Sequence, residues 1–406
     1  MCWAGILQPT LPSLKAAFVE ELESVQLTSV EASSLQSPAA HQADYLILDR
    51  RVRLAGNDAA ILDRFTNLYG AFRADVVGSP DLLIRYHLDA KGSLVVSGPA
   101  ENYRSAAPEV IQWPSVLMAR MILRELVTHW MIHAACVSRD GKAVVLAGGS
   151  GMGKTTLAAH LGAKGFALLS DEFAPISRSD GFVEPFPLRI GIREGPGRAL
   201  IQSMPAIDLN FQQDAKKLVD LSLMSGSPAT RALLHAVVFL TTKVTANVTT
   251  VQKRDAYLKA WFTGWSPVME REIVAETGAR ILSVKTDLDL LEVDMELEDL
   301  AKHTEPLRAI ARRHGTLLAQ IKYEDHEPID RSADSVCMRI PAAAGVMELI
   351  KKIPSSSRTA LLERVHGGKA SGLIADMSAR LKDVEFYKMV PGRLDSSIAH
   401  VEEMLK

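Results

Sequence analysis

The stretch AVVLAGGSGMGKTTLAAHL, residues 143–161, decides how the chain folds. It begins with apolar residues typical of a buried strand, passes through a glycine-rich loop, and ends in a run, Thr156–Leu161, that predicts a helix. Its central residues, Gly148–Thr155, fit the pattern G-x-x-x-x-G-K-[ST]. At average composition, such a match arises by chance in about one chain in 100 of this length.

Each part of this pattern has a physical task in holding phosphate. Glycines let backbone N–H groups turn toward the phosphates, and the start of the helix adds the positive end of its dipole. Lys154 would neutralise the β- and γ-phosphates, and the Thr155 hydroxyl would hold Mg²⁺. The alternative is a glycine turn that only caps a helix. The residues expected to contact the nucleotide are Gly148, Gly149, Ser150, Gly151, Met152, Gly153, Lys154, Thr155 and Thr156.

Two adjacent carboxylates follow the loop closely in sequence. Asp171 and Glu172 end the apolar run Phe166–Ser170, which predicts the next strand. With further strands expected at Ile132–Val137 and Leu234–Leu240, the rhythm of elements predicts an α/β core. One carboxylate could serve Mg²⁺ while the other accepts a proton from an attacking hydroxyl. The alternative is an acidic cap at the end of a strand.

The motifs of several other nucleotide-binding classes are missing from the sequence. It has no Leu-Ser-Gly-Gly-Gln stretch of the transporter type and no Asn-Lys-x-Asp guanine-reading motif. It also lacks the His-Arg-Asp and Asp-Phe-Gly motifs of eukaryotic-type protein kinases. A phosphate loop alone does not distinguish between these functions, so the interpretation depends on the two carboxylates that follow it.

Sequence outside this core predicts two further regions. Residues 1–115 contain short apolar runs typical of strands and a helical pattern over 57–72, which together predict a small N-terminal α/β accessory domain. A helix expected over 114–129 leads into a second domain, residues 116–406. Alternating charge blocks over 287–372 predict a solvated, helical insertion in that domain.

The composition excludes several classes of protein. The 406 residues include 46 Lys and Arg against 48 Asp and Glu, a net charge of -2, which argues against a polybasic nucleic-acid binder. Its longest apolar stretches, such as Leu233–Leu240, fall short of the roughly 18 residues that span a bilayer. Three scattered cysteines make no zinc or disulfide pattern. We therefore expect a cytoplasmic protein without nucleic-acid or membrane partners.

Three segments in register resemble the HPr kinase/phosphorylases and the wider group of bacterial kinases related to them. The first is His133, 15 residues before Gly148 on the preceding strand, and the second is the phosphate loop with its helix. The third, Lys164–Glu172, is similar to the family's Gly-x-x-Leu-x-x-Asp-Asp segment. Weaker similarity covers residues 183–190 and 386–394.

This resemblance implies a P-loop kinase core of the HPr kinase/PEP carboxykinase-like type, using ATP and Mg²⁺ and forming an oligomer. It implies that Asp171 is the general base toward a seryl or threonyl hydroxyl and that His133 orients that carboxylate. Lys154 would act on the nucleotide, and Thr155 and Glu172 would bind the metal. Gly149 replaces an Asp that the bifunctional enzymes usually carry, which argues against phosphorylase activity.

The sequence leaves three functions open. The leading hypothesis is an ATP-dependent kinase acting on a Ser or Thr hydroxyl of a protein or peptide. The second is a kinase for a small molecule such as a hydroxy amino acid, and the third is a nucleotide-gated regulatory module. Phosphoryl transfer benefits from a guanidinium near the phosphates. The sequence offers the basic residues Arg189, Arg193, Lys216 and Lys217 but does not select one of them. The alternative for each is a solvated side chain on the surface.

Overall fold

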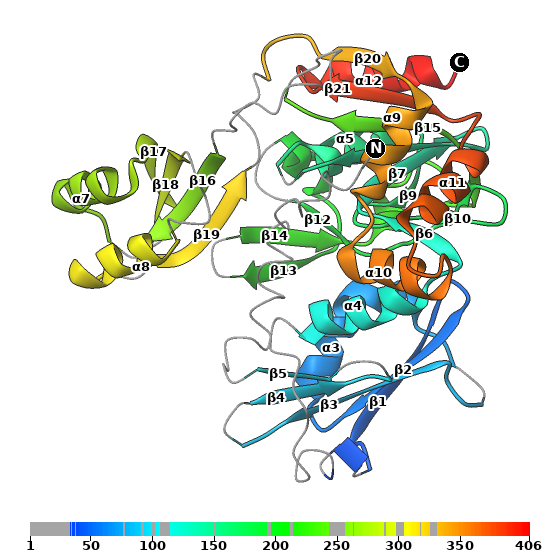
Figure 1. Cartoon of the computed structure of the whole chain (residues 1–406), viewed down its shortest axis with the longest axis horizontal. Coiled ribbons are helices and arrows are strands. Elements are labelled where there is room, and N and C mark those ends of the chain that lie inside the picture. The colour runs from blue at the N-terminus through cyan, green and yellow to red at the C-terminus, as the bar shows by residue number, and fades with distance from the viewer. Residues whose placement is uncertain are drawn as a thin grey trace, which may run out of the picture.

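The computed structural model is a mixed α/β protein with several sheets (Figure 1). It describes residues 33, 35, 36 and 38–406, apart from gaps at 76–77, 91–92, 100–101, 106–113, 150, 193–195, 212–213, 243–255, 263, 288–289, 298–303, 317 and 325–330. Within this described part, no helix has the length and apolar composition needed to cross a membrane. The mixed α/β class expected from the sequence is confirmed.

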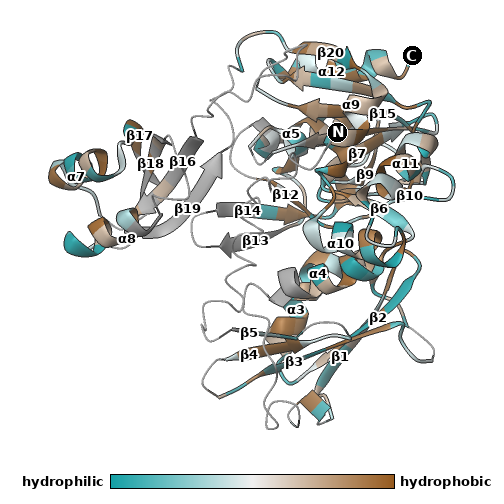
Figure 2. Ribbon diagram, in the orientation of Figure 1, coloured by the Kyte–Doolittle hydropathy of each residue, from teal (hydrophilic) through white to brown (hydrophobic). Residues whose placement is uncertain are grey.

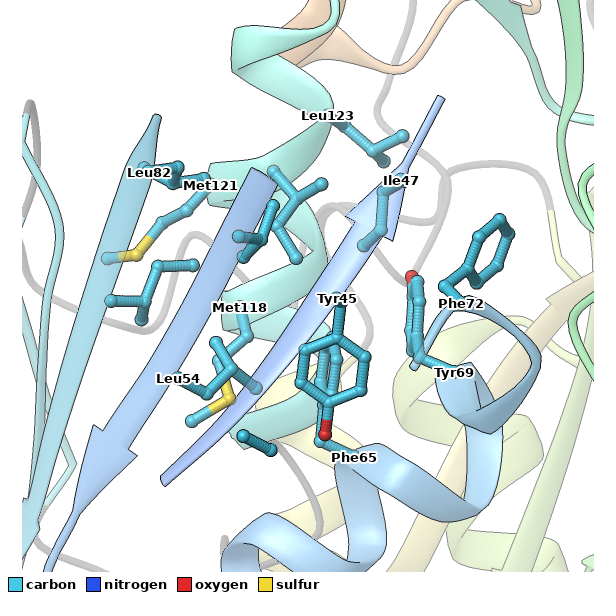
Figure 3. Packing of buried hydrophobic residues seen from close by; sticks show 14 of the residues in the cluster. Tyr45, Ile47, Leu54, Phe65, Tyr69, Phe72, Leu82, Met118, Met121 and Leu123 are labelled. Atoms are coloured by element: carbon cyan, nitrogen blue, oxygen red, sulfur yellow. The ribbon is translucent and has the colours of Figure 1, made fainter. Parts of the chain in front are cut away.

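The first lobe, here called the N-terminal lobe, is a five-stranded sheet with two helices against it. Its strands lie in the order β1 (His41–Ile47), β2 (Arg50–Gly56), β3 (Leu82–Leu88), β4 (Leu94–Ser97) and β5 (Asn102–Ser105). The helices are α3 (Ala59–Tyr69), followed by a 3₁₀ turn over Gly70–Phe72, and α4 (Pro114–Glu125). Helix α3 begins after Asp58, whose carboxylate accepts a hydrogen bond from Ile61 N at 2.9 Å. Figure 3 shows Met118, Met121 and Leu123 of α4 packed among the aromatic and aliphatic side chains of this sheet and α3.

The second part is a nine-stranded sheet, here called the main sheet. Its strands are β6 (His129–Ile132), β7 (Ala134–Arg139), β8 (Lys142–Gly148), β9 (Ala167–Ser170), β10 (Ala174–Ser177), β11 (Phe182–Val183), β15 (Ala232–Leu240), β20 (Val336–Ile340) and β21 (Glu385–Val390). They follow the order β6-β10-β11-β15-β8-β7-β9, with β21 between β15 and β20. Strand β15 is parallel to β8 and β21, and β7 is antiparallel to both β8 and β9. The carboxyl ends of β8, β9, β15 and β21 therefore meet at one edge.

Helices cover both faces of the main sheet. Side chains alternate along each strand, so that Val145 and Ala147 face one layer while Val144 and Leu146 face the other. Figure 2 shows that central strands such as β7 and β15 are hydrophobic along most of their length, as expected for strands buried on both sides. One layer contains α9 (Ala342–Ile350), α10 (Ser355–Arg364) and α11 (Ala370–Arg380), and the other contains α5 (Lys154–Ala163), α6 (Leu221–Met224), α12 (Leu394–Met404) and the 3₁₀ helix Pro196–Ile201.

Two smaller sheets complete the described structure. Strands β12 (Ile190–Ile192), β14 (Asp214–Val219) and β13 (Ala206–Phe211) form a three-stranded sheet. Strands β17 (Arg280–Asp287), β18 (Leu290–Leu297), β16 (Ala256–Phe262) and β19 (Leu318–Glu324) form a four-stranded sheet with α7 (Pro267–Thr277) and α8 (Thr304–Arg313). This last unit has a hydrophobic core of its own and is called the inserted lobe (Figure 1).

The expectation of a helical insertion over 287–372 is wrong in its secondary structure. That range holds β18, β19 and β20 as well as helices, and its helices α9 and α10 cover the main sheet. Strand β18 explains the error, because its acidic residues Glu292, Asp294 and Glu296 alternate with apolar ones, among which Val293 and Met295 are fully buried. A period of two indicates a half-buried strand, whereas the acidic composition alone suggested a solvated helix.

Candidate functional site

The phosphate loop lies where β8 ends and α5 begins. Gly148 is the last residue of β8 and pairs with Leu240 of β15, so closely that a Cβ at residue 148 would lie 2.9 Å from that of Leu240. Gly151 and Gly153 have φ angles of 81° and 91°, which favour glycine. The side chain of Met152 is buried in the hydrophobic core, which fixes this part of the loop against the main sheet and its helices. Ser150 lies outside the described residues.

Lys154 is the first residue of α5, after Gly153 at the helix start. Its ammonium group donates hydrogen bonds to the carbonyl oxygens of Gly148 at 2.9 Å and Gly149 at 3.0 Å. The side chain therefore folds back over the loop, where it carries positive charge to the N-terminal end of the helix. Thr156, in the first turn of α5, is half-buried.

A hydrogen bond joins the loop to the carboxylates after β9. Thr155 Oγ1 donates to Asp171 Oδ2 at 3.2 Å. Strand β7 lies between β8 and β9 in the sheet, but β8 and β9 run in the same direction, so their carboxyl ends lie at the same edge. The structure thus brings together the loop threonine and the first of the two carboxylates.

His133 lies at a break between β6 and β7, whereas a single strand was expected over Ile132–Val137. Its own N–H donates to Lys352 O at 2.8 Å, and Ala134 N donates to Glu172 O at 3.2 Å. Strand β6 pairs with β10, while β7 pairs with β8 and β9, so the chain changes partners at this residue. A second break, Asp171–Phe173 between β9 and β10, lies opposite the first. The hydrogen bond from Ala134 N to Glu172 O joins the two breaks, one of which holds His133 and the other Asp171 and Glu172.

The imidazole of His133 faces Glu172. His133 Nδ1 is 3.7 Å from Glu172 Oε1, a distance suited to an ion pair when the ring is protonated. The two side chains retain 35% and 34% of their surface exposed, so solvent reaches both. Two contacts among the four polar side chains are thus established, from Thr155 to Asp171 and between His133 and Glu172.

Aromatic rings connect this site to the N-terminal lobe. The ring of His133 meets Phe173 edge-on with centroids 6.0 Å apart, and Phe186 contacts Phe173 at 6.0 Å and Phe72 at 4.8 Å. Burial, with a smaller contribution from the charge of Glu172, raises the pKa of Tyr69 in α3 above its ordinary value. The N-terminal lobe is therefore linked to His133 through the rings of Phe186 and Phe173.

Of the basic residues weighed from the sequence, the structure shows an ionic partner for Arg189. Arg189 donates to Asp220 at 2.8 Å as an ion pair, and Arg193 lies outside the described residues. The structure places a different cation at the phosphate loop: Arg331 Nη2 donates to Gly151 O at 3.2 Å. Sequence reasoning missed Arg331 because it lies 180 residues from Gly151 and belongs to no local pattern.

The loop and its neighbours fit a magnesium nucleotide. Loop glycines with positive φ and a helix N-terminus suit a phosphate chain. Magnesium in kinases is usually held by one or two carboxylates together with phosphate oxygens, and Thr155, Asp171 and Glu172 offer a hydroxyl and two carboxylates at this edge. Where the chain is described, no group of three or more His, Cys, Asp and Glu side chains is placed to form a metal centre of its own.

Comparison with known proteins finds distant similarity among solved structures. No protein-family model and no curated protein matches the chain. Among solved structures, it is similar to the Hpr(Ser) kinase/phosphatase from Coxiella burnetii, with 15% identity over 46% of this chain and 90% of that chain, at a TM-score of 0.18. A similarity at this level carries no argument about function.

Proposed function

We propose that the chain is an ATP-dependent kinase with a P-loop core of the HPr kinase/PEP carboxykinase-like type, which transfers the γ-phosphoryl group to a Ser or Thr hydroxyl of a protein or peptide. The observation that carries the proposal is the hydrogen bond from Thr155 to Asp171, which joins a complete phosphate loop to adjacent carboxylates. Nucleotide binding alone needs the loop, whereas transfer to a hydroxyl also needs a metal ligand and a proton acceptor.

The pairing of side chains supports a division of labour between the carboxylates. Asp171 contacts Thr155, the residue expected on Mg²⁺, so Asp171 would act on the metal side. Glu172 faces His133, so its Oε1 would accept the proton of the attacking hydroxyl and His133 would stabilise the carboxylate. This proposal exchanges the two roles that the resemblance implies. Bound Mg²⁺ would supply electrostatic stabilisation of the phosphates.

Incubation of the purified protein with γ-labelled ATP and cell lysate tests the reaction class. Label in a protein or peptide supports the proposal, and label in a metabolite would instead support the small-molecule kinase. Absence of label in both, with ATP still bound, would favour the regulatory module. Lys154→Ala should abolish labelling and weaken ATP binding, because the loop loses its cation.

Magnesium titrations of two variants test the division of labour. Asp171→Asn should raise the Mg²⁺ concentration needed for half-maximal transfer, because it weakens the metal side of the site. Glu172→Gln should lower transfer by about 10²–10⁴-fold at saturating Mg²⁺, because general-base catalysis contributes on that order. Asp395→Asn, an exposed carboxylate at the start of α12, is the control. The opposite pattern would return the general base to Asp171.

A further inference from the structure

Arg331 brings a guanidinium onto the phosphate loop from a distant part of the chain. Besides the hydrogen bond from Nη2 to Gly151 O, its Nη1 lies 3.0 Å from where a Cβ of residue 153 would stand. Gly153 therefore leaves the space that the guanidinium occupies. Arg331 and Lys154 both donate hydrogen bonds to carbonyl oxygens of the loop Gly148–Thr155, so two cationic side chains contact this loop.

The position of Arg331 is set by the segment that follows it. Ala333 O accepts a hydrogen bond from Arg393 N at 2.6 Å, and Ser335 N donates to Ser396 Oγ at 3.1 Å. These bonds fasten residues 333–335 to the start of α12, which packs in the same layer as α5. The guanidinium is thus held at the loop by the main sheet and its helices, independently of the inserted lobe.

The charge of Arg331 lacks an anionic partner within the described residues. Its one hydrogen bond to a described residue goes to a neutral carbonyl, and no described carboxylate forms an ion pair with it. Partial desolvation lowers the pKa of Arg331 from the ordinary arginine value, although the residue as a whole is exposed. A guanidinium carries five N–H donors, so one that donates to a neutral carbonyl keeps further donors with which to bind an arriving anion.

We infer that Arg331 binds the β- and γ-phosphates of a nucleotide held by the loop Gly148–Thr155. The inference rests on the proposed function, since it assumes that the loop binds a nucleoside triphosphate. A guanidinium presents paired N–H donors that match phosphate oxygens, and it cannot lose its charge at neutral pH. Arg331 therefore supplies a second cation opposite Lys154.

Calorimetric titration of the full chain with MgATP, MgADP and AMP tests this assignment. Arg331→Ala should weaken binding of MgATP and MgADP by about tenfold to a hundredfold, the range for a lost hydrogen bond to a charged group, and leave the affinity for AMP unchanged. Arg331→Lys should recover part of the loss because it keeps the charge. Arg339→Ala is the matched control, since Arg339 lies in the same segment with its side chain 67% exposed and pairs with Glu385.

Thermal unfolding separates phosphate binding from a structural role. Without nucleotide, Arg331→Ala should melt close to the wild-type temperature, because the exposed side chain contributes one hydrogen bond to a described residue. With MgATP, its melting temperature should rise less than that of the wild type. Arg331→Met, which keeps the apolar stem, replaces the alanine variant if the latter is unstable.

Three results would overturn the inference. A lower melting temperature without nucleotide, accompanied by equal weakening for AMP and MgATP, would assign Arg331 a structural role. Wild-type affinities of Arg331→Ala for MgATP and MgADP, with binding lost in Lys154→Ala, would reject Arg331 while keeping the proposed nucleotide site. Failure of the wild-type chain to bind any of the three nucleotides would reject both.

Discussion

The N-terminal lobe and the inserted lobe are attached to the main sheet in different ways. The core of the N-terminal lobe continues into the site-bearing part of the chain, because Met131, Phe173, Phe186 and Leu188 belong to the same buried cluster as its strands and helices. Among the described residues, the core of the inserted lobe is drawn from residues 260–311, with Trp265 and Ile281 packed against it. The first lobe is therefore expected to unfold together with the site, and the second to unfold separately.

The strongest test of this difference is the removal of a ring at the first junction. Phe186 is 1% exposed and contacts Phe72 of the N-terminal lobe and Phe173 beside the site. Phe186→Ala should lower the free energy of unfolding by about 3–5 kcal/mol, the usual cost of truncating a buried Phe. Urea unfolding followed by hydrogen exchange should show both regions losing protection together.

Phe182→Ala provides the matched control for that variant. Phe182 lies on β11 in the same part of the chain, is only half-buried, and stacks under Arg231 at 4.4 Å. Phe182→Ala should lower the free energy of unfolding far less than Phe186→Ala. It should leave hydrogen-exchange protection unchanged in both the N-terminal lobe and the site. If Phe186→Ala exposed the N-terminal lobe while the site stayed protected, the shared core would not act as one cooperative unit.

The inserted lobe should respond to the equivalent change by itself. Phe262 on β16 is fully buried and contacts Trp265, and a unit this small has little stability to spare. Phe262→Ala should remove about 3 kcal/mol from this lobe, enough to open it locally. Hydrogen exchange should report lost protection in β16–β19. Calorimetric MgATP affinity should be retained, because Ala333 and Ser335, which follow Arg331, are hydrogen-bonded to the start of α12. A large loss of MgATP affinity would show that the lobe shapes the loop.

The same contrast explains what sequence could predict. Residues 143–161 are predictable because each position answers a local requirement: buried strand, glycine at positive φ, helix start. The break at His133 is not, because it depends on carbonyl groups of Lys352 and Glu172 that approach only in the folded chain. Arg331 is likewise invisible to local pattern, since a lone arginine acquires its place through the tertiary contacts of Ala333 and Ser335.

The smallest expected effect is an acid response confined to the inserted lobe. Glu272 of α7 accepts hydrogen bonds from His314, which follows α8, and from Arg313, the last residue of α8. These hydrogen bonds lower the pKa of Glu272, while desolvation acts in the opposite direction. A carboxyl group whose pKa is lower in the folded state stabilises the fold fully above its unfolded pKa, near 4.3, and loses that contribution as pH falls through the folded value. Hydrogen exchange of β16–β19 should therefore be faster in Glu272→Gln than in wild type at pH 6, and the difference should shrink below about pH 4.

Asp81 in the N-terminal lobe gives the counterpart. Hydrogen bonds from the side chain and backbone of Arg51 lower the pKa of Asp81 to about 2, so its contribution persists to lower pH. If the cores are shared as described, Asp81→Asn should alter protection in the N-terminal lobe and at the site together, whereas Glu272→Gln should leave the site untouched. If both substitutions changed hydrogen-exchange protection equally throughout the chain, the N-terminal lobe and the inserted lobe would not differ in how they are coupled to the site.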